Sequence, residues 1–165
     1  MKYRMYFFVP YNLSPIQQGI QAGHAALEYA SKFGNNDDYK SFVTNDKTWI
    51  ILNGGTTNNN MFGTMQDILM ELHSIGVNLS IFQEPDINDA LTAICFLTSE
   101  VVWDYETYPD FYDWLTQSYP ESFDTALKYK KHQDLLDNEY YKEWMGLMGE
   151  KNVLLRNLLK NKKLA

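Results

Sequence analysis

The chain has 165 residues, of which 45% are hydrophobic and 15% are aromatic, and its formal net charge is -7. This composition excludes a mainly disordered chain, because disordered chains lack the apolar residues needed to form a core. The acidic balance argues against broad nonspecific binding of nucleic acid, which depends on a local basic surface. The sequence has no long apolar span and no signal-peptide pattern, and its one cysteine, Cys95, cannot form an internal disulfide. We therefore expect a cytoplasmic protein without a membrane segment, with Cys95 in the core.

The first predicted elements are a strand over residues 3–9 and a helix over residues 15–33. The strand sequence, YRMYFFV, is aromatic and apolar, as is typical of a buried strand. Ser14 suits the N-cap of the helix and Pro15 its first turn, while Gly34 follows the last helical residue. Both ends of this helix are therefore well specified.

The predicted helix carries a polar stripe formed by Gln17, Gln21 and His24, which are spaced at i, i+4 and i+7. Since the helix follows a strand, the stripe begins near the carboxyl end of that strand, where open α/β sheets bind their ligands. Gly19 and Gly23 lie inside the same helix and cost about 1 kcal/mol each relative to alanine. We expect close packing or substrate access to compensate for this cost.

The rest of the first 99 residues predicts three more strands and one more helix. The strands are expected over residues 49–52, 77–82 and 91–97, and the helix over residues 61–75, with a polar loop at residues 35–38. The last two strands are separated only by residues 83–89, which is too short for a crossover helix, so they should be antiparallel neighbours or make a sharp return. We therefore expect an α/β domain over residues 1–99, with a four-stranded mixed β-sheet in three α/β/α layers.

Residues 100–165 predict a helical C-terminal extension packed on this domain. Helices are expected over residues 121–136, 139–148 and 153–159. The aromatic residues between Trp103 and Tyr119 are expected to pack on the sheet domain, with a dimer interface or base stacking as alternatives.

Two polar features have more than one interpretation. Residues 53–60, NGGTTNNN, are either a connector or a loop whose backbone N–H groups bind phosphate at the following helix. Basic residues in the extension form either solvated helix faces or local phosphate or RNA contacts. They fall in two clusters: Lys128, Lys130 and Lys131, and then Lys151, Arg156, Lys160, Lys162 and Lys163.

Two motifs resemble those of type II peptidyl-tRNA hydrolases, in particular the bacterial and phage-like branch. Residues 12–25, NLSPIQQGIQAGHA, are similar to the form L-S-P-G-Q-Q-x-x-Q-x-x-H-A, with Ile16 in place of the glycine. Residues 82–86, FQEPD, followed by residues 91–94, LTAI, are similar to the elements F-R-E-P-D and L-T-A-I. The motifs occur in the order of that branch. The resemblance covers about residues 3–98, and the extension lies outside it.

The resemblance implies hydrolysis of the ester that joins a peptide to the 3′ end of tRNA. The catalytic histidine, carboxylate and threonine of the family correspond to His24, Asp86 and Thr92. Ester hydrolysis needs a positioned water and a base that titrates near neutral pH, and imidazole is such a base. Asp86 would orient the imidazole, and Thr92 would bind the water or the ester carbonyl. The candidate substrate-binding residues in the motifs are Gln17, Gln21, Asn12 and Glu84.

Two other functions fit the same residues. One is a non-catalytic module that binds and sequesters a nucleotide or an RNA end, and the other is a hydrolase of a different nucleotide-derived substrate. The expected partner is the tRNA 3′ end or a nucleotide-like small molecule, with no membrane, and a homodimer is an alternative assembly. No cofactor is expected. No metal is expected either, because one cysteine and three histidines show no recognisable ligand spacing.

Overall fold

The computed structural model describes residues 1–57, 63–122 and 136–165. The chain divides into two compact units, one formed by residues 1–100 together with 158–165, and one formed by residues 101–157. The first unit contains the β-sheet, and the second is helical. No helix within the described ranges combines the length and the apolar character that crossing a membrane requires.

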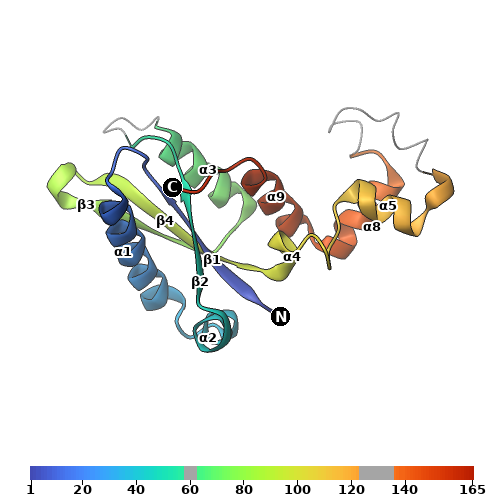
Figure 1. Cartoon of the computed structure of the whole chain (residues 1–165), viewed down its shortest axis with the longest axis horizontal. Helices are drawn as coiled ribbons and strands as arrows, with labels where there is room; N and C mark the ends of the chain where they lie inside the picture. Colours follow the sequence, from blue (N-terminus) through green and yellow to red (C-terminus); the bar gives the residue numbers. More distant parts are fainter. Residues whose placement is uncertain (58–62, 123–135) are drawn as a thin grey trace. The chain divides into compact units, whose positions relative to one another are not determined.

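The first unit is built on a four-stranded mixed sheet with the strand order β2-β1-β4-β3 (Figure 1). The strands are β1 (Tyr3–Val9), β2 (Thr48–Asn53), β3 (Leu79–Glu84) and β4 (Ala90–Ser99). β1 and β2 are parallel, whereas β4 is antiparallel to both β1 and β3. The predicted mixed sheet and the antiparallel pairing of its last two strands are therefore confirmed. β1 and β4 lie in the centre of the sheet, which explains why both are long apolar runs.

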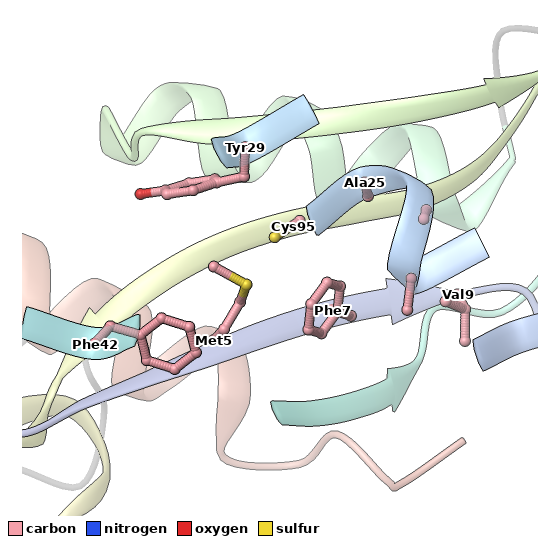
Figure 2. Close-up of a cluster of buried hydrophobic side chains, with 9 residues drawn as sticks. Met5, Phe7, Val9, Ala25, Tyr29, Phe42 and Cys95 are labelled. Atoms are coloured by element: carbon pink, nitrogen blue, oxygen red, sulfur yellow. The ribbon is translucent and has the colours of Figure 1, made fainter. Parts of the chain in front are cut away.

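Helix α1 (Pro15–Phe33) covers one face of the sheet, and its bounds are those that the sequence predicts. Met5, Phe7 and Val9 alternate along β1 and point toward this helix, where they pack with Ala25 and Tyr29 (Figure 2). The same cluster contains Ala22, Phe42, Ala93 and Cys95. Cys95 is thus a core residue as expected, and burial raises the pKa of its thiol.

Helix α3 (Thr64–Ile75) lies on the opposite face of the sheet (Figure 1). The alternate side chains of the central strands face this side, and the rings of Phe8 and Phe96 stack with their centroids 6.1 Å apart. The buried residues of α3 are Met65, Ile68, Leu69 and Leu72. The three-layer α/β/α architecture is confirmed for the described residues, and positions 61 and 62 of the predicted helix lie outside them.

Strand β3 begins and ends two residues later than predicted. The backbone N–H of Val77 donates to the carbonyl oxygen of Leu72 at 3.2 Å, and Gly76 has a left-handed conformation with φ of 75°. The hydrogen bond of Val77 and the left-handed Gly76 complete the end of α3, so the strand starts only after Val77. Pairing with β4 then continues as far as Glu84, which lies opposite Ala90. Glu84 is therefore a strand residue and not part of the predicted turn.

The segment after α1 is helical where the sequence predicts a loop. It forms α2 (Asp37–Ser41), followed by a π-helix over Phe42–Asp46. The hydroxyl of Tyr3 donates to Asp38 Oδ1 at 2.6 Å, and the Tyr3 N–H donates to Asp46 Oδ2 at 2.9 Å. Burial and the bond to Asp38 raise the pKa of Tyr3 to about 12. Contacts with β1 thus hold a short helix that local sequence does not specify.

The last residues of the chain pair with the outer edge of β2. The Asn53 N–H donates to the Lys163 carbonyl oxygen at 2.8 Å, and the Ala165 N–H donates to the Ile51 carbonyl oxygen at 3.0 Å. Leu52 and Leu164 form an antiparallel bridge. This pairing covers backbone groups that an exposed strand edge would leave open. Residues 158–165 therefore belong with the sheet, although the sequence analysis assigns them to the extension.

The second unit has an aromatic core of its own. Its helices include α5 (Phe111–Ser118) and α8 (Glu139–Met148), and the chain enters and leaves it through α4 (Glu100–Trp103) and α9 (Glu150–Leu159). The core consists of Val101, Phe111, Leu115, Tyr141, Trp144, Met148 and Val153. The predicted helix over residues 139–148 is confirmed, whereas α9 begins three residues earlier than predicted. The helix predicted over residues 121–136, with Lys128, Lys130 and Lys131, lies almost wholly outside the described residues.

Arg156 is the polar centre of the second unit and is only 2% exposed. Its guanidinium donates to the carbonyl oxygen of Val101 at 2.8 Å, to that of Tyr108, and to the carboxylate of Asp110 at 3.3 Å. It also lies over the ring of Tyr105, 4.4 Å from the centroid. The interpretation of Arg156 as part of a solvated face or a phosphate contact is therefore wrong, because its donors are bonded inside the protein.

Replacing Arg156 with lysine should destabilise the second unit. We expect Arg156→Lys to lower the free energy of unfolding by about 2–3 kcal/mol, because one ammonium cannot reach the same set of oxygens as the guanidinium fork. Unfolding in urea, followed by tryptophan fluorescence, measures the change. The control is Lys142→Ala, which removes an exposed pair with Glu139 and should cost less than about 0.5 kcal/mol. Equal losses in the two variants would contradict this role of Arg156.

Gly19 and Gly23 face open space. A Cβ atom built at either position meets no atom of the described residues within 4 Å, apart from the nearby backbone of α1 itself. Among the described residues, close packing therefore does not compensate for these glycines, and substrate access stays a prediction.

Both glycines should be replaceable by alanine with a gain in stability. We expect Gly19→Ala and Gly23→Ala each to raise the free energy of unfolding by about 0.5–1 kcal/mol, because alanine loses less conformational freedom in a helix. Urea unfolding is the measurement. Gly76→Ala is the control and should destabilise the protein, because Gly76 has φ of 75°. A loss of stability in either α1 variant would contradict the open space beside that glycine.

Candidate active site

The two sequence motifs meet through a chain of hydrogen bonds between α1, β3 and β4. Gln21 of α1 donates from Nε2 to Glu84 Oε2 of β3 at 2.7 Å. Thr92 of β4 donates its hydroxyl to Gln21 Oε1 at 2.8 Å, and this hydroxyl also lies 3.3 Å from the carbonyl oxygen of Phe82. Thr92 and Gln21 are buried, while Glu84 is half-buried. The chain of bonds therefore runs from the interior of the sheet to a carboxylate that solvent can reach.

The chemistry of the three side chains decides which atom donates and which accepts in each of these hydrogen bonds. An ionised carboxylate only accepts hydrogen bonds, so the amide nitrogen of Gln21 must face Glu84. The amide oxygen of Gln21 then faces Thr92, whose hydroxyl supplies the hydrogen. In this set of hydrogen bonds, the buried side chains of Thr92 and Gln21 each have a partner, as burial requires. Three separate elements thus fix the side chain of Gln21 in one orientation.

His24 lies beside this chain on the next turn of α1. Its side chain is exposed, and its ring stacks on Phe82 with the centroids 4.4 Å apart and an interplanar angle of 17°. Phe82 precedes Glu84 by two residues in β3. The contacts His24–Phe82 and Gln21–Glu84 are therefore consecutive along one line, which we call the α1–β3 seam (Gln21, His24, Phe82 and Glu84).

Asp86 lies outside the α1–β3 seam. It is exposed in a 3-10 turn (Pro85–Ile87), and Asn88 and Asp89 follow it in left-handed conformations. Within the described parts of the chain, no hydrogen bond or ion pair joins Asp86 to His24. Of the predicted catalytic residues, the structure therefore brings Thr92 into contact with Gln21, which in turn binds Glu84, and places His24 beside Gln21 on α1. It does not pair His24 with Asp86.

The remaining candidates, Gln17 and Asn12, lie in the turn before α1 or in its first turn. Gln17 Oε1 accepts from the Ser14 N–H at 3.1 Å, and the Ser14 side chain accepts from the Gln17 N–H, so Gln17 forms a capping box. Asn12 is exposed. Gln18, to which the sequence analysis assigns no role, is buried and donates to the Pro10 carbonyl oxygen at 3.0 Å. Gln17 and Gln18 thus fix the start of α1.

An open apolar depression of about 490 Å³ adjoins the outer side of α1, and the sequence analysis does not predict it. Its lining includes Ile20, Gly23, Leu27, Trp49 and His24. Ile20 is 50% exposed and Leu27 is 70% exposed, although both residues are apolar. The volume lies within the range of small-molecule sites. The one signal available in the sequence was the spacing of Ile20 and Leu27 on the side of the helix opposite its buried residues.

In the described part of the loop after β2, the backbone N–H groups of Gly54, Gly55 and Thr56 are bonded within the protein. The N–H of Gly54 donates to the Val9 carbonyl oxygen at 2.8 Å, and the N–H of Gly55 donates to Asn53 Oδ1 at 2.8 Å. The N–H of Thr56 donates to the hydroxyl of Thr64 at 2.9 Å. These bonds favour the connector interpretation for residues 53–57, and residues 58–60 lie outside the described part of the chain.

No three His, Cys, Asp or Glu side chains come together as a possible metal site in the described ranges. No family model matches the chain, and the search of curated proteins found no match. The resemblance to type II peptidyl-tRNA hydrolases therefore depends on the two sequence motifs quoted above.

Removing the Thr92 hydroxyl should destabilise the protein through Gln21. We expect Thr92→Val to lower the free energy of unfolding by about 1–3 kcal/mol, because it leaves the buried amide oxygen of Gln21 without its donor. In a Gln21→Leu background the same change should cost about 1 kcal/mol less. Urea unfolding of the four proteins of this cycle measures the coupling.

The control for this cycle is Thr98→Val, also in β4. The Thr98 hydroxyl is buried and has no hydrogen-bond partner among residues 1–57, 63–122 and 136–165, so its removal should be neutral or stabilising. Additive losses for Gln21 and Thr92 would contradict the contact between them.

Proposed function

We propose that this chain is an esterase that hydrolyses the bond between a peptide and the 3′ end of tRNA. The observation that supports this proposal best is the hydrogen-bond chain Thr92–Gln21–Glu84 beside the exposed imidazole of His24. These residues come from both motifs that resemble the hydrolase family. A proton acceptor and a fixed polar network at one place are the components that water-dependent ester cleavage needs.

In the proposed reaction, neutral His24 takes a proton from a water molecule as the water oxygen bonds to the ester carbonyl carbon. The bond from that carbon to the ribose oxygen then breaks, and the imidazolium returns the proton to this leaving oxygen. One water is consumed, and a peptide carboxylic acid and a tRNA hydroxyl are released. The family resemblance implies that a carboxylate assists this step.

Recognition is proposed to be confined to the end of the tRNA. The formal net charge of -7 disfavours a long contact with the phosphate backbone, since such contacts depend on lysine and arginine. The side chains of the α1–β3 seam would instead bind the ester and the terminal ribose. The proposed substrate arises in translation, so we propose that the protein acts in the cytoplasm.

A second candidate function is a module that binds an RNA end or a nucleotide without cleaving it. The observation that favours it is the position of Asp86, which is exposed and makes no described contact with His24. A pocket that binds the same group without activating water would leave the substrate intact.

The proposed esterase should depend on His24. We expect the purified chain to hydrolyse N-acetylated aminoacyl-tRNA, and His24→Ala to lower kcat about 100- to 1000-fold, because the proton acceptor is lost. His73→Ala is the matched control, because His73 is exposed on α3 away from this site. Circular dichroism should show that both variants are folded.

The other outcomes of this assay separate the candidate functions. Binding of the labelled tRNA without turnover by the unmodified chain would favour the non-catalytic module. Equal turnover by the unmodified chain and by His24→Ala would exclude His24 as the base.

A further inference from the structure

We propose that Glu84, rather than Asp86, is the carboxylate that acts beside His24, and that Thr92 is a positioning residue that holds Glu84 through Gln21. This inference depends on the proposed esterase function and names the side chains that would carry it out. It changes the role of three residues. Glu84 becomes a catalytic residue, Thr92 no longer contacts the substrate, and Asp86 becomes dispensable.

The first reason is the backbone that carries each carboxylate. Glu84 is the last residue of β3 and is paired with Ala90 of β4, so the sheet fixes its position. Asp86 lies beyond the strand in a short exposed turn. Catalytic groups are most effective when the fold holds them in place before the substrate binds. This favours the carboxylate on the strand.

The second reason is the side chain of Glu84 itself. It is half-buried, and it accepts a 2.7 Å hydrogen bond from Gln21, which is in turn oriented by the 2.8 Å bond from Thr92. One oxygen of the carboxylate is thus held by the protein, and the other can bind water or substrate. Among the described residues, no hydrogen bond of this kind joins the Asp86 side chain to α1.

The third reason is the position of Glu84 relative to His24. Gln21 and His24 are three residues apart on α1, so their side chains are neighbours on the helix surface. Their partners on β3, Phe82 and Glu84, are two residues apart, so their side chains lie on the same face of the strand. The imidazole and the Glu84 carboxylate are therefore adjacent groups on the same seam.

Thr92 does not contact the reacting groups and acts only by holding Gln21. It is 0% exposed, and its hydroxyl hydrogen is directed toward Gln21, so it is not available to a substrate. In the proposed step, the Glu84 carboxylate accepts a hydrogen bond from the attacking water and stabilises His24 while the imidazole carries the water proton. No bond to Glu84 forms or breaks, and the proton ends on the ribose oxygen as before.

The decisive test compares two isosteric variants in the assay with N-acetylated aminoacyl-tRNA. We expect Glu84→Gln to lower kcat about 100-fold and Asp86→Asn to change it less than about threefold, as expected if only Glu84 supports the base. The reverse order would overturn the inference. Turnover that is unchanged in Glu84→Gln but lost in His24→Ala would also overturn it, while leaving the proposed function intact.

The positioning role of Thr92 has its own test. We expect Thr92→Val to lower kcat about tenfold with KM changed less than about twofold, and Thr92→Ser to restore kcat to within about threefold, because serine keeps the hydroxyl. Circular dichroism confirms that each variant is folded at the assay temperature. Equal loss in the serine and valine variants would overturn the role of the hydroxyl.

A measurement without substrate separates this inference from the proposed function. In ¹⁵N NMR spectra, Glu84→Ala and Thr92→Val should each displace the side-chain amide resonance of Gln21, whereas Asp86→Ala should leave it unchanged. Displacement by Asp86→Ala as large as that by Glu84→Ala would overturn the inference. Absence of turnover by the unmodified chain would remove the proposed function and with it the catalytic part of the inference. The Gln21 resonance would still decide which carboxylate the network holds.

Discussion

The hydrogen bond from Gln21 to Glu84 joins residues that are 63 positions apart in the chain. It connects α1 to β3, and through the Gln21 amide it includes Thr92 of the central strand β4. Unpaired polar groups are costly inside a protein, so this set of bonds restricts how α1 lies on the sheet. The packing of the first unit and the arrangement of its candidate site therefore depend on the same contact.

The candidate site changes from a closed interior to an open surface over a short distance. Thr92 is fully buried, Gln21 is buried, Glu84 is half-buried and His24 is exposed. The buried side chains of Thr92 and Gln21 thus hold in place the side chain of Glu84, which solvent can reach. The apolar depression on the outer side of α1, near Gly23 and Leu27, adds a surface without charged groups beside the same helix. These features are consistent with the proposed action on the end of an RNA rather than along its backbone.

The second unit shows that a charge pattern does not reveal burial. Arg156 belongs to a sequence cluster of basic residues, and yet it is the buried centre of a hydrogen-bond network. The lysine side chains at 151 and 163 in the same cluster are exposed. Nothing in the spacing of these residues separates them, because the carbonyl oxygens that bind Arg156 come from residues about 50 positions earlier in the chain, Val101 and Tyr108.

Local sequence signals alone determined the helix and the strand whose ends are marked by capping residues or proline. The strand over residues 3–9 and the helix over residues 15–33 agree with the structure because an apolar run, an N-cap serine and a proline act within a few residues. The mixed sheet followed from the shortness of the connection between its last two strands. Tertiary structure decided the rest: α2 forms because Tyr3 binds Asp38, and β3 extends to Glu84 because β4 pairs with it. The sequence named the residue types of a candidate site, but only the pairing of distant elements decided which carboxylate a glutamine could hold, because a hydrogen bond depends on position in space and not on spacing along the chain.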